Sequence, residues 1–150
     1  MRAILMAVAV ALASSSIAGA HVTVAPRESP AGAGERYTVR VPTEGQVATT
    51  SVDLEVPADV TITGVLVGGG FTYESRREND RIVGITWKQE IKPGEIAEYV
   101  FFARNPKAGQ QIAWKARQRF ADGTSADWVG VEGDRRPASV TRLTAAQARP

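Results

Sequence analysis

Residues 110–131 decide the fold class, and they read QQIAWKARQRFADGTSADWVGV. Up to Ala121 this stretch contains no glycine or proline, so it is where a helix would be expected if the chain had one. Apolar residues instead take even positions and basic residues odd ones: Ile112, Trp114, Ala116 and Phe120 against Lys115, Arg117 and Arg119. A period of two is typical of a strand, and the Asp122-Gly123 pair is a strong hairpin signal. The stretch therefore predicts two antiparallel strands joined by a tight turn.

Short runs of the same kind occupy the chain between residues 21 and 110. Strand-like segments are separated by proline, glycine and Asn-Asp turns, and they lie at 21–24, 37–41, 52–56, 61–67, 71–76, 81–88 and 96–103. The last of these is apolar on both faces, which is typical of a central strand in a two-layer structure. About eight or nine short strands predict an all-β, single-domain antiparallel β-sandwich of immunoglobulin-like or cupredoxin-like type.

The composition excludes several classes of function. The chain of 150 residues has no cysteine, which excludes disulfides, thiolate metal sites and thiol nucleophiles. Its 18 basic and 16 acidic residues are scattered, so we expect no nucleic-acid partner. The single histidine, His21, is the one imidazole that a Ser-His-Asp mechanism could use. We therefore expect that the protein is not an enzyme.

The first 20 residues are typical of a secretory signal peptide. Arg2 gives a positive start, residues 3–13 are an apolar run too short for a permanent membrane anchor, and Ala18-Gly19-Ala20 is a cleavage site of small residues. Cleavage after Ala20 would send a chain beginning at His21 to the periplasm or the medium. We expect residues 21–131 to form the β-sandwich. Residues 132–150 are polar and arginine-rich, and we expect a flexible tail without a membrane anchor.

A histidine at the first position of a mature chain suits a copper ion. Its α-amine and its ring Nδ1 can bind the same ion, whereas the nitrogen of an internal histidine is part of an amide. Nitrogen donors of this kind favour Cu(II) among the divalent ions. The alternative is that His21 is only the residue at which the peptidase cuts.

The segments that follow resemble the YcnI-like family of exported bacterial proteins. The matching stretches, in family order, are 21–28 (HVTVAPRE), 37–44 (YTVRVPTE), 86–88 (TWK), 91–95 (IKPGE), 105–106 (NP), 114–116 (WKA) and 128–130 (WVG). The resemblance covers essentially all of the chain after residue 20. It implies a cupredoxin-like β-sandwich that binds Cu(II) through a single-histidine brace. It also implies a link to periplasmic or membrane proteins that handle copper.

The same resemblance implies a set of site residues. His21 would supply the amine and ring ligands, Glu28 would be the oxygen ligand or a close partner, and Trp128 would lie over the metal. The alternatives are a solvated loop carboxylate for Glu28 and a core-packing residue for Trp128. Glu35 is a rival to Glu28 by spacing, but its position at the start of a strand beside a basic residue indicates a surface side chain. The other two tryptophans, Trp87 and Trp114, are expected in the core.

Two other classes of function stay open beside the exported copper-binding protein that stores, buffers or delivers Cu(II). One is a β-sandwich interaction or adhesion module without a metal. The other is a copper-dependent oxidative enzyme, which would resemble copper monooxygenases but would lack their second histidine. An enzyme would turn over with bound copper and a reductant, whereas a carrier would only bind and release the ion.

Overall fold

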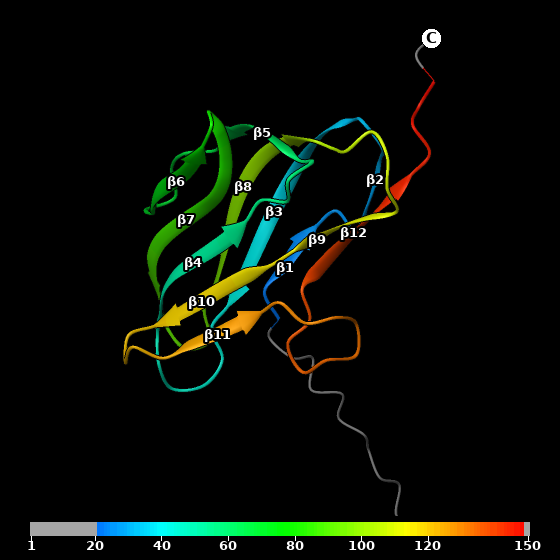
Figure 1. Cartoon of the computed structure of the whole chain (residues 1–150). Coiled ribbons are helices and arrows are strands. Elements are labelled where there is room, and N and C mark those ends of the chain that lie inside the picture. Colours follow the sequence, from blue (N-terminus) through cyan, green and yellow to red (C-terminus); the bar gives the residue numbers. More distant parts are fainter. Residues whose placement is uncertain (1–20, 149–150) are drawn as a thin grey trace, which may run out of the picture.

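The computed structural model describes residues 21–148, and β-strands make up all of its regular secondary structure there (Figure 1). In chain order the strands are β1 (Thr23–Ala25), β2 (Glu28–Pro30), β3 (Gly34–Pro42), β4 (Thr49–Glu55), β5 (Thr61–Val65), β6 (Thr72–Glu78), β7 (Arg81–Ile91), β8 (Ile96–Arg104), β9 (Gln111–Trp114), β10 (Ala116–Phe120), β11 (Ser125–Trp128) and β12 (Ser139–Thr144). Within this part of the chain there is no helix that could span a membrane. The predicted signal peptide lies outside the described residues.

Two sheets form the layers of the sandwich. One has the strand order β1-β3-β8-β5 and the other β11-β10-β4-β7-β6, and every pair within them is antiparallel. A smaller sheet, β2-β12-β9, extends the sandwich at one side, and its β2–β12 pair is parallel. The prediction of an all-β, mainly antiparallel sandwich is confirmed.

Aromatic side chains from both layers fill the core. Trp87 of β7 stacks on Tyr99 of β8, with ring centroids 5.2 Å apart and an interplanar angle of 7°. Trp114 of β9 packs against Tyr37 of β3 and Phe101 of β8 at 4.9 and 5.4 Å. Trp87 and Trp114 are 0% and 1% exposed, which confirms that both are core residues.

The hairpin that the sequence predicts at residues 122–123 is present. β10 pairs with β11 so that Ala116 faces Trp128, and the turn places Gly123 at φ +84°, a left-handed conformation that glycine adopts without strain. The long run before the hairpin divides at Lys115, however. Its first part, β9, belongs to the small sheet and its second part, β10, to the five-stranded sheet.

The prediction that residues 132–150 form a flexible tail is wrong for residues 139–144. They form β12, which pairs with β2 on one side and with β9 on the other. Ser139 and Thr141 of this strand are buried, and the hydroxyl of Thr141 accepts a hydrogen bond from Trp114 Nε1 at 3.0 Å. The folded domain therefore extends past the predicted boundary at residue 131.

Candidate metal centre

The structure brings together two of the three residues that the sequence singles out for a metal site. His21 lies just before β1, and Trp128 ends β11 in the other layer. Their ring centroids are 5.1 Å apart and their planes are tilted by 52°. The imidazole is partly exposed, whereas the indole is 9% exposed. The Trp128 indole therefore covers one side of His21, the only histidine in the sequence.

A buried polar chain supports Trp128 from the interior. Its Nε1 donates to Gln118 Oε1 at 3.3 Å, and Gln118 is only 2% exposed. Gln118 Nε2 donates in turn to the carbonyl oxygen of Pro42 at 2.9 Å and to the hydroxyl of Thr49 at 2.7 Å. The Thr49 hydroxyl shares a further hydrogen bond of 2.6 Å with that of Thr43. Sequence reasoning missed Gln118, although an amide at an inward position of an alternating strand was a usable signal.

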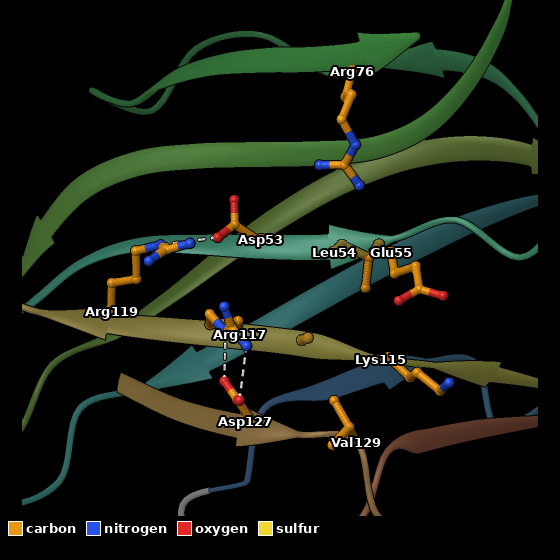
Figure 2. A pocket seen from close by; sticks show the side chains of 10 residues that line it. Asp53, Leu54, Glu55, Arg76, Lys115, Arg117, Arg119, Asp127 and Val129 are labelled. Atoms are coloured by element: carbon orange, nitrogen blue, oxygen red, sulfur yellow. Dashed lines mark hydrogen bonds and ion pairs between the residues drawn. The ribbon is translucent and has the colours of Figure 1, made fainter. Parts of the chain in front are cut away.

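On the outer face of the same two strands, an ion pair fixes β11 to β10 (Figure 2). Arg117 and Asp127 face each other across the strands, with Nε–Oδ1 and Nη2–Oδ2 distances of 2.6 and 2.9 Å. The hydrogen bond from Arg117 holds the pKa of the Asp127 carboxyl below its usual range. The pair lines a shallow groove of about 310 Å³, in which Arg119 also binds Asp53 at 3.1 Å.

Glu28, the third residue singled out for the site, pairs with a basic side chain in the structure. Its carboxylate accepts a hydrogen bond from Arg142 of β12 at 3.2 Å, and both side chains are exposed. The chain passes from β1 to β2 along β12, since Val24 contacts Ser139 and Arg27 contacts Arg142. Glu28 thus lies further along this path than His21. Among residues 21–148 there is no group of three or more His, Cys, Asp or Glu side chains suited to hold a metal ion.

The rival carboxylate, Glu35, has structural partners. Its Oε2 accepts the hydroxyl hydrogen of the buried Ser29 at 2.7 Å, and its Oε1 accepts from the backbone N–H of Arg36. Ser29 accepts in turn from the side-chain amide of Asn105 at 2.7 Å, and Asn105 accepts from the Tyr37 hydroxyl at 2.6 Å. Glu35 therefore belongs to the polar contacts that seat β2 on the domain.

A groove of about 640 Å³ borders the segment that follows Trp128. Its lining comes from that segment, residues 129–138, from the small sheet, and from Arg27 and Lys115 next to strands of that sheet. It includes Glu28 and Arg142 as well as the exposed apolar side chains of Val129 and Val131. Neither His21 nor Trp128 lines this groove.

These features define an immunoglobulin-like β-sandwich with a histidine and a tryptophan paired across its two layers. The chain belongs to the family described as "Domain of unknown function (DUF1775)", whose model matches residues 21–143. The resemblance to the YcnI-like family that the sequence indicates is thereby confirmed.

One relative of this chain is the copper-binding protein CutI of Bacillus subtilis (strain 168). It is 36% identical to this chain over 133 residues, which are 87% of this chain and 65% of CutI. The chain therefore spans less than two thirds of the length of this relative.

Solved structures agree on the fold. An uncharacterized protein from Nocardia farcinica with an immunoglobulin-like fold matches with a TM-score of 0.72 and 26% identity, over 86% of this chain and 100% of that one. A cohesin module from a family 33 glycoside hydrolase of Clostridium perfringens matches with a TM-score of 0.51 and 13% identity, over 87% of this chain and 100% of the module.

Proposed function

We propose that this protein, after removal of residues 1–20, is an exported Cu(II)-binding protein that stores, buffers or delivers copper. The observation that carries the proposal is the contact between the His21 imidazole and the Trp128 indole, 5.1 Å apart at the start of the domain. The family model also begins at residue 21, and the relative CutI is named a copper-binding protein.

The donor set fits a copper ion on its nitrogen side. Cleavage after Ala20 would free the α-amine of His21, which with ring Nδ1 gives two nitrogen donors in one chelate. The indole beside the ring has only a donor N–H, so its role is to cover the site rather than to bind the ion. Glu28 stays our proposed oxygen ligand or close partner, and to reach the metal its carboxylate would have to leave Arg142.

We also propose that the protein carries copper without catalysis, in the periplasm or outside the cell. A copper-dependent oxidative enzyme would need a second imidazole at the metal, and the sequence holds one histidine. Carriage implies that copper passes to or from other copper-handling proteins. An enzyme would pass electrons continuously from a reductant through bound copper to an oxidant such as O₂, whereas in the carrier the reductant would reduce the single bound Cu(II) ion once.

Native mass spectrometry of the protein exported by its host, with and without one equivalent of Cu(II), tests this function. We expect one species that begins at His21 and gains one copper ion. A His21→Gln variant is the control, and we expect it to gain none. A processed chain that binds no copper, or a variant that binds it equally well, would overturn the proposal.

A further inference from the structure

We propose that Gln118 is a positioning residue that holds the Trp128 indole against His21 and so shapes the copper site. The inference rests on the proposed function only where copper is concerned, because the ring contact itself exists without a metal.

Gln118 is a buried polar side chain on a strand face that is otherwise apolar. It lies on the inward face of β10 together with Ala116, opposite Val52 of β4 and Ala126 of β11, and these three neighbours are buried and apolar. Burying an amide among apolar side chains costs free energy unless its polar atoms are hydrogen-bonded. If the amide orients the Trp128 indole, its presence is explained at a position where packing alone would favour an apolar side chain.

The hydrogen bonds of Gln118 fix which way its oxygen points. The carbonyl oxygen of Pro42 can only accept, so it requires the amide nitrogen of Gln118, 2.9 Å away. The same nitrogen donates its second hydrogen to the Thr49 hydroxyl oxygen, 2.7 Å away. A flipped amide would set its oxygen against the Pro42 carbonyl and its N–H groups against the indole N–H. The oxygen must therefore face Trp128.

The orientation of the Trp128 indole depends more on a hydrogen bond than the orientation of the Trp87 indole does. Trp87 Nε1 has no hydrogen-bond partner in the described part of the chain, but its ring is stacked on Tyr99 at an angle of 7°. The aromatic contact of Trp128 is with the ring of His21. His21 is partly exposed and lies at the start of the domain. The indole also packs in the hydrophobic core, and the hydrogen bond to Gln118 is the directional contact that orients it from the interior.

The strand that carries Trp128 is fixed independently of Gln118. The Arg117–Asp127 pair on the outer face joins the residues that directly precede Gln118 and Trp128 (Figure 2). Removing the amide should therefore release the indole side chain while β11 stays paired with β10.

The copper-free test uses Gln118→Met, which keeps an unbranched side chain of similar size but removes the amide. NMR on the mature chain would follow the cross-relaxation signals between the ring protons of His21 and Trp128. We expect these signals to weaken strongly and the Trp128 Nε1–H to exchange faster with solvent. Unchanged ring contacts in a folded Gln118→Met protein would overturn the proposal.

A matched control removes the partner of a different indole. Thr141→Val deletes the hydroxyl that accepts from Trp114 Nε1, and we expect the His21–Trp128 signals to stay as they are. If Gln118→Met does not fold, Thr49→Val loosens the Gln118 amide by removing one of its acceptors. We expect weaker His21–Trp128 contacts there as well, and unchanged contacts would again contradict the proposal.

A double-mutant cycle with Trp128→Phe then tests the link to copper. In the chain with Trp128, Gln118→Met should weaken Cu(II) binding about three- to tenfold, the equivalent of one hydrogen bond, and alter the paramagnetic spectrum. In the Trp128→Phe background it should change neither. An equal effect in both backgrounds would show that Gln118 does not act through Trp128. If the unchanged protein binds no copper, the proposed function fails while the NMR test still decides the role of Gln118.

Discussion

Truncating Trp114 to alanine tests the proposal that Trp114 serves the core alone, whereas Trp128, which is also buried, covers the copper site beside His21. Trp114 is 1% exposed, contacts Tyr37 and Phe101 at 4.9 and 5.4 Å, and donates its Nε1–H to Thr141. The structure around it comes from three different strands, which cannot close fully over the space that the indole would leave.

The expected loss follows from these contacts. Removing a fully buried tryptophan costs about 3–5 kcal/mol of unfolding free energy, and each favourable aromatic pair adds about 0.5–1.5 kcal/mol to what burial contributes. Two such pairs and one hydrogen bond place Trp114→Ala near the top of that range, at about 4–5 kcal/mol. For a domain of this size the melting temperature should fall by roughly 10–20 °C.

Urea unfolding of the copper-free protein, followed by far-UV circular dichroism, measures this loss. The matched control is Trp128→Phe, which keeps an aromatic ring at a position that is 9% exposed, and we expect it to lose about 1–3 kcal/mol, mainly because the buried Gln118 oxygen loses its donor. Copper-dependent fluorescence quenching should fall in Trp128→Phe and persist in Trp114→Ala. A smaller loss of stability in Trp114→Ala than in Trp128→Phe would refute this division of roles.

Three further predictions concern other parts of the structure. Glu28→Gln should weaken Cu(II) binding and change its paramagnetic spectrum, whereas Glu35→Gln should do neither; identical spectra and affinities of the two variants would remove the case for Glu28. Burial raises the pKa of both Tyr37 and Tyr99 to about 12, so the stability they confer is complete below pH 10 and is lost between pH 10 and 12, by about 2–3 kcal/mol each. Phenolate absorbance should therefore appear for both only near pH 12, and titration of both near pH 10 would contradict the burial. Gly130→Ala would bring a methyl group within 3.0 Å of a backbone carbonyl oxygen of the loop folded over it, and chemical denaturation should record a loss of about 1–3 kcal/mol; an unchanged midpoint would refute that packing.

Alternation along the chain was sufficient to predict most strands, but it missed the three-residue β2 and the longer β12. In β12 the buried positions are Ser139 and Thr141, so the strand has no apolar stripe to detect. Their hydroxyls are satisfied by tertiary partners, which are the backbone of Val24 for one and Trp114 and Pro26 for the other. A pattern search cannot foresee hydrogen bonds between segments that lie 27 to 115 residues apart in the sequence.

The candidate site was predictable only in part for the same reason. Family resemblance pointed to His21 and Trp128, and the structure pairs their rings. The Arg142 partner of Glu28 could not be predicted, because it depends on β12 lying parallel to β2. Gln118 was detectable as an amide on an inward face, but its role depends on the register that places it beside Trp128.

The central claim is that copper is held by the free amine and the ring of His21. The most direct measurement is a competition titration with Cu(II) on two purified chains, one beginning at His21 and one with a single alanine before it. Adding the same alanine after Pro150 controls for the extension itself. Because the extra residue turns the amine into an amide, we predict tight binding by the first chain and by the control and its loss in the extended chain. Equal Cu(II) affinity in all three would contradict the account.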